Sequence, residues 1–270
     1  PAERTPLNRY YRQSLVWPGH FSPDANRSFV LMPAGKPRGA VVLLHGLTDS
    51  PYSVRHLAEN YQKHGFVAVV PRLPGHGTAP GALTNVEWEA WLAATRLAVR
   101  EATRLTGNDL PLHLVGYSNG GALAMKYALD ALDAPELRKP QQIVLLSPMI
   151  GVTAFARFAG FAGLPALLPA FAKAAWLNIA PEYNPYKYNS FPVNAARQSW
   201  LLTKALQEQI GRAAQNHTLD RLPPVLAFQS VMDSTVSTRA VVTGLFDQLP
   251  ANGSELVVFD INQAASFRPL

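Results

Sequence analysis

Apolar residues in this chain gather in short continuous runs, separated by longer stretches in which polar and apolar residues mix. The central runs are apolar throughout, without alternation, which is typical of strands buried on both faces of a sheet. Strands are predicted at residues 27–35, 39–46, 66–73, 111–116, 142–148, 224–230 and 255–260. Helical patterns fill most of the intervals, so the order favours repeated strand–helix–strand units.

Two intervals carry clear helix signals. Residues 50–65 begin with Ser50 as a helix cap and Pro51 in the first turn, and Gly65 ends the pattern. Residues 84–107 begin with Thr84 followed three positions later by Glu87, the spacing of a capping box. One side of this second helix is predicted to carry Trp88, Trp91, Leu92, Thr95 and Val99. The predicted fold class is α/β, with a mostly parallel central sheet flanked by helices and right-handed connections.

Residues 149–215 interrupt this alternation of strand and helix patterns. They lack a strand signal and are rich first in Ala, Phe, Leu and Pro and then in Tyr and Asn. We interpret them as a helical cap inserted over the strand ends. The chain then divides into a first part of the core at 1–148, the cap at 149–215 and a second part of the core at 216–270. The most apolar stretch, 158–172, is too short and too broken by Gly and Pro for a transmembrane helix.

Composition narrows the class of protein. Of the 270 residues 48% are hydrophobic and 16% charged, which is typical of a globular protein. The net charge is +6, but the basic residues are scattered singly, so nucleic-acid binding is disfavoured. There is no cysteine, which excludes disulfides, thiolate catalysis and cysteine–zinc sites. The seven histidines form no closely spaced pair, so neither a metal nor an organic cofactor is expected.

One motif carries a specific chemistry. Ser118 lies between Gly116 and Gly120, where an apolar strand passes into a helix-forming segment. A nucleophilic serine on a sharp strand-to-helix turn needs glycine two positions to either side, because larger side chains would collide with the neighbouring strand or helix. The following helix directs its N-terminus at the site, which favours developing negative charge. Ser118 is therefore the candidate nucleophile; the alternative is an ordinary turn.

A second motif follows an earlier strand, at His45-Gly46-Leu47. Ester hydrolysis needs two backbone N–H groups directed at the tetrahedral oxyanion. We expect Leu47 to supply one of them and Asn119 the other, with Gly46 allowing close approach of the backbone. His45 is interpreted as a structural imidazole that supports this loop, since it lies on the wrong strand for a catalytic base.

An acidic residue follows a late strand. Asp233 lies just beyond residues 224–230 and before a helical segment at 237–249, the position of an orienting carboxylate in the order Ser, Asp, His. A simple turn or capping role is the alternative for Asp233. Asp220 precedes the same strand and is the weaker candidate.

With these motifs in order, the chain resembles the α/β-hydrolases of the monoglyceride lipase and bacterial carboxylesterase branch. The resemblance covers roughly 40–260 and includes "LLHGLTDSP", "PRLPGHGTAP", "GYSNGG" and "SVMDSTVS". It implies the α/β-hydrolase fold, a serine mechanism and an acyl pocket covered by a lid. It also implies that His76, in the Gly-His-Gly loop, is structural or lines the pocket rather than acting in the triad.

The chain departs from the family at the triad histidine, which in the family follows the last strand. Here "INQAASFRPL" follows, and the last histidine of the chain is His217. Three explanations stay open: the segment with the histidine is not part of this chain, another histidine such as His217 reaches in, or the protein is an inactive hydrolase that binds a ligand. The chain begins at Pro1 without an initiator Met, so we expect that a signal segment or other upstream residues have been removed.

The expected function is hydrolysis of carboxylic esters, medium-chain acyl esters or acylglycerols, through an acyl-enzyme on Ser118. The partner is then a small acyl ester, held against the apolar residues of 149–215, which would also make transient contact with a lipid surface. The alternative is a non-catalytic ligand-binding or interaction protein on the same scaffold. The lack of cysteine and of an initiator Met favours an exported, periplasmic protein. The sequence does not indicate an oligomeric state.

Overall fold

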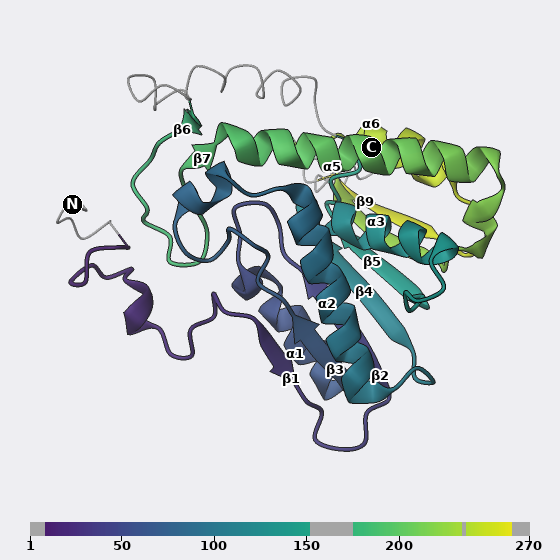
Figure 1. Cartoon of the computed structure of the whole chain (residues 1–270), viewed down its shortest axis with the longest axis horizontal. Coiled ribbons are helices and arrows are strands. Elements are labelled where there is room, and N and C mark those ends of the chain that lie inside the picture. The colour runs from purple at the N-terminus through teal and green to yellow at the C-terminus, as the bar shows by residue number, and fades with distance from the viewer. Residues whose placement is uncertain (1–8, 152–174, 234–235, 261–270) are drawn as a thin grey trace, which may run out of the picture.

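The computed structural model describes residues 9–151, 175–233 and 236–260. Within these residues one mixed sheet forms the centre of the molecule (Figure 1). Its strands are β1 (Phe29–Leu31), β2 (Gly39–Leu44), β3 (Phe66–Val70), β4 (Leu112–Tyr117), β5 (Gln142–Leu146), β8 (Val225–Ser230) and β9 (Glu255–Phe259). Their spatial order is β1-β3-β2-β4-β5-β8-β9, with β1 antiparallel and the other neighbours parallel. Every predicted strand is confirmed as a member of this sheet.

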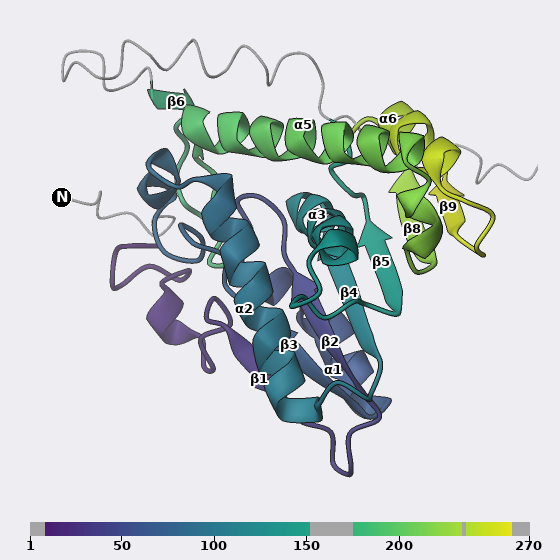
Figure 2. The same ribbon diagram turned by 45° about the vertical axis from the view of Figure 1, so that its right-hand side comes forward.

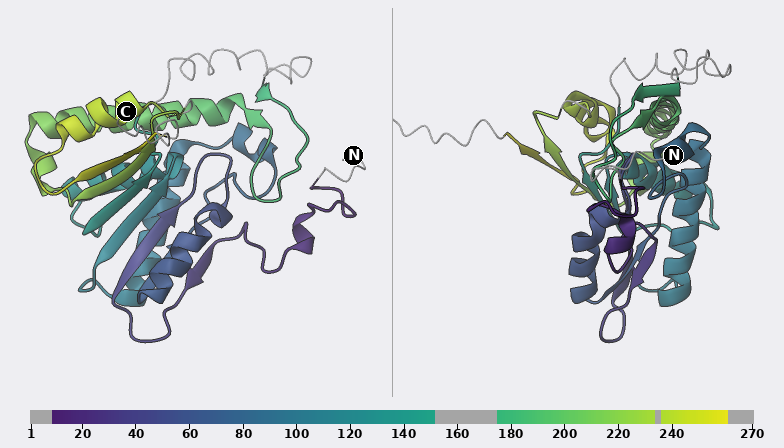
Figure 3. Two further views of the ribbon diagram at one scale, coloured as in Figure 1. Left: turned by 180° about the vertical axis from the view of Figure 1, so that it is seen from behind. Right: turned by 90° about the vertical axis from the view of Figure 1, so that its left-hand side faces the viewer.

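Helices cover both faces of the sheet, as the sequence predicted. The helices of the described residues are α1 (Arg55–Lys63), α2 (Trp88–Thr106), α3 (Asn119–Asp133), α5 (Val193–Gln215) and α6 (Thr238–Gly244). Viewed along the sheet, α1 lies on one side and α2 on the other (right panel of Figure 3). The smaller apolar core, between the sheet and α1, contains Val41, Leu43 and Val115. The larger core lies between the sheet, α2, α3 and α5.

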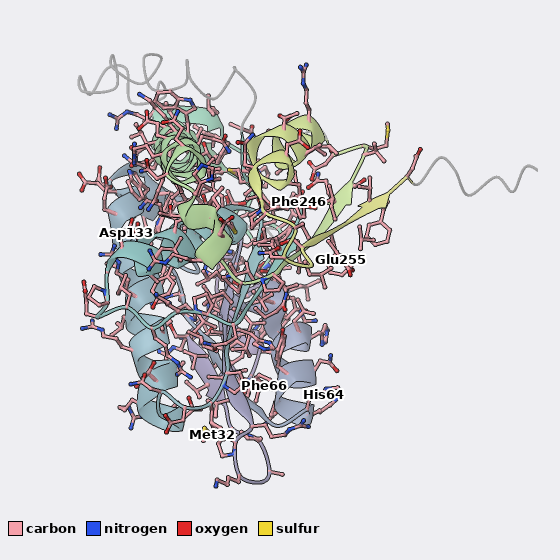
Figure 4. The ribbon with its side chains drawn as sticks, turned by 90° about the vertical axis from the view of Figure 1, so that its right-hand side faces the viewer. Met32, His64, Phe66, Asp133, Phe246 and Glu255 are labelled. Carbon is pink, nitrogen blue, oxygen red and sulfur yellow. The ribbon has the colours of Figure 1, made fainter. Side chains whose placement is uncertain are left out.

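Parallel pairing brings the carboxyl ends of the central strands to one edge. Leu44 pairs with Gly116 across β2 and β4, and Tyr117 pairs with Leu146 across β4 and β5. Helix α5 crosses this edge of the sheet (Figure 2). Phe66, at the amino end of β3, lies with Met32 and His64 at the opposite end of the molecule (Figure 4). Loops that follow β2, β4 and β5 therefore meet beneath α5.

The start of α2 differs from its prediction. Thr84 ends a 3₁₀ turn, Pro80–Thr84, and its hydroxyl donates to the carbonyl of Gly81. The helix begins at Trp88 with Glu87 as the capping residue, and no side-chain cap bond forms. The predicted capping box is therefore wrong, because Pro80 starts a turn of its own and the Thr84 hydroxyl is used inside it. The predicted apolar side of α2 is confirmed.

The segment predicted as a cap is described in part. Residues 152–174 lie outside the described residues. Beyond them β6 (Trp176–Asn178) pairs with β7 (Phe191–Pro192) in a two-stranded antiparallel sheet that the sequence did not indicate. Helix α5 then buries Leu202, Leu206 and Ile210 in the larger core. The division of the chain at 149 and 215 stays a prediction. Among the described helices none has the length and apolarity needed to cross a bilayer.

Candidate active site

Ser118 lies at a sharp turn between β4 and α3. Its backbone has φ 53° and ψ −114°, a conformation that residues with a side chain rarely adopt. The turn is closed by direct backbone contact. A Cβ on Gly116 would lie 2.4 Å from the carbonyl oxygen of Gly120, and a Cβ on Gly120 would lie 2.2 Å from the carbonyl oxygen of Leu44. Neither position has room for a side chain, so both glycines are required for this turn.

Hydrogen bonds hold the strained backbone of Ser118 in place. Its N–H donates to the carbonyl of Leu146 on β5 at 2.9 Å. Its carbonyl accepts from the N–H of Gly121 at 2.9 Å and from the N–H of Met149 at 3.0 Å. The turn is thus bonded on one side to the neighbouring strand and on the other to the loop that follows it, and such over-determination is what allows a strained conformation to persist.

The loop after β2 lies beside this turn. The approach of Gly120 to Leu44 and His45 brings the first turn of α3 against the end of β2. Thr48 has a left-handed φ of 69°, and its carbonyl accepts from the N–H of Tyr188 at 2.8 Å. Among the described residues, the N–H groups of Leu47 and Asn119 donate no hydrogen bond. Free amides are what an oxyanion-binding pair requires.

His45 is fully buried beneath this loop. Its Nε2 accepts from the N–H of Leu73 at 3.1 Å, so the proton is on Nδ1, which lies 2.9 Å from the carbonyl oxygen of Gly46. Burial, with a smaller contribution from His76, lowers the pKa of His45 to about 3. Both ring nitrogens are committed to the protein, and neither is left to take a proton from Ser118.

His76 packs against His45 with the ring centroids 5.0 Å apart. Its Nδ1 lies 2.9 Å from the carbonyl oxygen of Pro74, which also accepts from the indole N–H of Trp91. Burial lowers the pKa of His76 to about 4. The two imidazoles are therefore neutral at physiological pH.

Asp233 follows β8, two strands away from Ser118 and at the same edge of the sheet. Its backbone N–H donates to Ser230, and its Oδ1 accepts from the N–H of Val236 at 2.9 Å. The pKa of Tyr117, the residue before Ser118, is raised by burial and then by the charges of Asp49 and Asp233. Asp233 is thus within electrostatic reach of the turn that carries Ser118.

Two weaker candidates lie elsewhere. Asp220 is in the 3₁₀ turn Thr218–Arg221, and exposed His217 precedes that turn. Both come before β8, at its amino end. The six residues of β8 put about 20 Å of strand between them and the carboxyl edge. The structure therefore does not bring either residue to Ser118, and the hypothesis that His217 reaches into the site is wrong.

Sequence reasoning missed three residues that contact the site loops. Asp49 is 8% exposed, and its Oδ2 lies 2.7 Å from the position that a Cβ on Gly46 would take. Burial raises the pKa of Asp49, and the charge of Lys187, whose Nζ lies 4.0 Å from Oδ1, lowers it by less. Tyr188 joins three loops, and Ser199 of α5 contacts the side chain of Asn119. No local pattern marks them, because each becomes relevant only through contacts with residues distant in the sequence.

Tyr188 and Arg9 fix the loop at 75–78 to the segment that precedes α5. The Tyr188 hydroxyl accepts from the N–H of Thr78 at 2.8 Å and donates to the carbonyl of Gly75 at 3.0 Å. The buried guanidinium of Arg9 lies over the Tyr188 ring, 4.9 Å from its centroid, and donates to the carbonyls of Thr78 and Asn184. The N-terminal segment thus stabilises one wall of the site.

A serine held in a left-handed turn at the carboxyl edge of a mostly parallel sheet, with an earlier loop packed against it, defines the α/β-hydrolase class. The model of the family described as serine aminopeptidase, S33, matches residues 35–260. That range covers most of the chain, which therefore belongs to this family.

Known relatives and structures agree with this class. A thermostable monoacylglycerol lipase of Bacillus sp. (strain H-257) is 36% identical over 89 residues, 33% of this chain and 34% of the relative. Phospholipase YtpA of Bacillus subtilis (strain 168) is 27% identical over 129 residues, 44% of this chain and 44% of the relative. The monoacylglycerol lipase structure from Paleococcus ferrophilus has a TM-score of 0.63 at 19% identity, over 86% of this chain and 88% of that chain.

These matches confirm the resemblance drawn from the motifs. At its level of identity the structural match establishes the fold alone. The matched part of this chain spans 34% and 44% of the two curated relatives, less than half of either.

A Cβ at position 120 tests the backbone contact directly. We expect Gly120→Ala to lower the free energy of unfolding by about 1–3 kcal/mol or more, because the added atom meets the backbone of a central strand. The matched control is Gly211→Ala in α5, where no atom lies within 4 Å of the added Cβ. In that control the free energy of unfolding should rise by about 0.5–1 kcal/mol, because Ala has a higher helix propensity than Gly. Urea unfolding measures both; a Gly120→Ala protein as stable as the parent would contradict the geometry.

The buried imidazoles predict a stability that depends on pH. In the unfolded chain a histidine binds a proton near pH 6.5, whereas His45 and His76 bind theirs only near pH 3 and 4. The contribution of each neutral histidine to the free energy of unfolding is therefore complete above about pH 6.5. It is lost as the pH falls from there toward the folded pKa, by about 1.4 kcal/mol per pH unit for each histidine. Urea unfolding between pH 7 and 5 measures the loss. Imidazole NMR should find both rings neutral at pH 5, and a midpoint near 6.5 for either ring would rule out this explanation.

Proposed function

We propose that this protein is a serine hydrolase of carboxylic esters that works through an acyl-enzyme on Ser118. In this mechanism the Ser118 hydroxyl oxygen attacks the acyl carbon, and the N–H groups of Leu47 and Asn119 stabilise the oxyanion. The general base takes the Ser118 proton and passes it to the departing alcohol; water then hydrolyses the acyl-enzyme, which releases the acid and regenerates Ser118. Asp233 orients the general base.

The observation that carries the proposal is the turn at Ser118. A left-handed serine costs free energy in the folded protein, of order 1–3 kcal/mol, and such strain clusters at functional sites. The N-terminus of α3 begins at the next residue, so its partial positive charge acts where the oxyanion forms. The free backbone N–H groups of Leu47 and Asn119 supply hydrogen-bond donors for the negative charge of the oxyanion.

The general base of this mechanism is not identified, because no histidine follows the last strand, where the family has it. Both nitrogens of His45 are occupied, His76 is buried and neutral, and His217 lies at the opposite edge of the sheet. None of these three histidines is therefore proposed as the general base, and Asp233 is proposed to orient a base that the sequence does not identify. Loss of one triad member leaves roughly 10³–10⁴-fold catalysis over water, from the oxyanion donors and substrate binding.

The proposed substrate is a neutral acyl ester such as a monoacylglycerol. Support comes from the names of the relatives, a monoacylglycerol lipase and a phospholipase, and from the apolar composition of residues 149–215. The family description names aminopeptidases, so an amino-acid amide is the competing substrate class. Lipid-surface contact through residues 149–215 remains part of the proposal.

A fluorophosphonate probe tests the nucleophile. We expect the full-length protein to be labelled and Ser118→Ala to lose the label, because the probe phosphonylates only an activated serine. Ser147→Ala is the matched control: Ser147 also follows a sheet strand with a left-handed φ, 42°, but has no glycine at two positions to either side. It should keep the label.

The substrate class is tested by comparing the rates at which the protein hydrolyses p-nitrophenyl acyl esters and amino-acid p-nitroanilides. Faster turnover of the esters, lost in Ser118→Ala, supports the proposal. Labelling with turnover of the anilides alone would reassign the substrate to amides. No labelling of the full-length protein would refute a serine mechanism and favour a non-catalytic binding protein.

A further inference from the structure

The side chain of Asn119 gives this site a connection to α5. Asn119 is fully buried at the first position of α3, and its Oδ1 lies 3.2 Å from the Oγ of Ser199. Ser199 is also buried, on the side of α5 that faces the sheet. The Nδ2 of Asn119 has no hydrogen-bond partner among the described residues. Within that part of the chain, Ser199 is thus the hydrogen-bond partner that orients the amide.

Helix α5 is fixed to the core independently of this contact. Asn194 donates to the carbonyls of Leu83 and Val86 at 2.9 Å each, and Gln198 accepts from the N–H of Trp88 at 3.2 Å. Farther along, Leu202, Leu206 and Ile210 are buried in the larger core. Helix α5 passes over α3 in Figures 1 and 2, and the two helices are in contact. Ser199 is therefore on a rigid element that can orient Asn119, rather than the reverse.

The contact closes a ring around the nucleophile. The Oγ of Ser199 also lies 2.6 Å from the sulfur of Met149, and the N–H of Met149 donates to the carbonyl of Ser118. Ser118 is covalently joined to Asn119. A ring of contacts therefore runs from Ser118 through Met149 and Ser199 to Asn119 and back to Ser118. Because Ser199 has one hydroxyl proton and both the Asn119 Oδ1 and the Met149 sulfur are acceptors, it donates to only one of them at a time.

We propose that Ser199 is a positioning residue for the oxyanion site: it holds the side chain of Asn119 so that the backbone N–H of Asn119 points at the developing oxyanion. This inference rests on the proposed function. Misdirecting one donor costs transition-state stabilisation but leaves ground-state binding of the ester unchanged. The effect is therefore expected in kcat and not in KM.

Ser199→Ala removes the hydroxyl from the ring. We expect kcat for ester hydrolysis to fall on the order of ten-fold, with KM unchanged. Thr203→Ala is the matched control: its hydroxyl is equally buried one turn along α5 and donates to the carbonyls of Ser199 and Trp200, away from Asn119. It should share any loss in melting temperature but keep kcat. Ser199→Thr, which retains a hydroxyl, should recover most of the rate.

A double-mutant cycle shows through which residue Ser199 acts. Asn119→Ala keeps the backbone N–H but removes the amide, so adding Ser199→Ala to it should cost no further kcat. The proposal would be overturned if the loss of kcat in the double variant equalled the product of the two single losses. An unchanged kcat in a folded Ser199→Ala protein would also overturn it. A kcat loss as large in Thr203→Ala would assign the effect to α5 packing instead.

A second readout needs no turnover. In ¹H–¹⁵N spectra, Ser199→Ala should shift or broaden the backbone amide signal of Asn119, and Thr203→Ala should leave it unchanged. An Asn119 signal identical in all three proteins would refute the positioning role even if the wild-type protein hydrolyses no ester. An inactive wild type with the shift present would instead refute the proposed function alone.

Discussion

Close backbone packing between the first turn of α3 and the end of β2 determines the rest of this structure. The α-carbon of Gly120 lies so near the Leu44 carbonyl that no side chain fits between them. Ser118, two residues before Gly120, has a left-handed φ and lies at the apex of the turn. The close approach of Gly120 to Leu44 brings the N–H of Asn119 beside the loop that carries Leu47. A looser contact would move the loop that carries Leu47 away from the nucleophile.

Around this contact, the protein surrounds the carboxyl edge with groups whose charge states are set by burial. His45 and His76 lie beneath the loops as neutral imidazoles, because removal from water disfavours their charged forms. Asp49 is buried near Tyr117, and burial disfavours its ionisation too. The loops themselves are held by Tyr188 and Arg9, which bond to the backbone of residues 75–78 and contact each other. The site is rigid because these supports come from four distant parts of the chain.

Sequence patterns were enough to predict the strands and the turn, because the signals for both are local. Continuous apolar runs mark strands buried on both faces, and glycines two positions from Ser118 mark a turn without room for side chains. The capping box at Thr84 failed since Pro80, four residues earlier, starts a separate turn. Ser199 and Asp49 could not be found, as a polar residue in a helix or loop gives no sign of what it contacts after folding. His217 stayed open as a candidate base because its proximity in sequence to β8 does not indicate at which end of that strand it lies.

The central claim is that the hydroxyl of Ser118 and the amides of Leu47 and Asn119 face one reacting centre. A crystal structure of the full-length protein after reaction with a p-nitrophenyl alkylphosphonate tests it most directly. We expect phosphorus bonded to the Ser118 oxygen and the phosphonyl oxygen about 2.7–3.1 Å from both amide nitrogens. A phosphonyl oxygen directed away from both amides, or an adduct on a different residue, would contradict it.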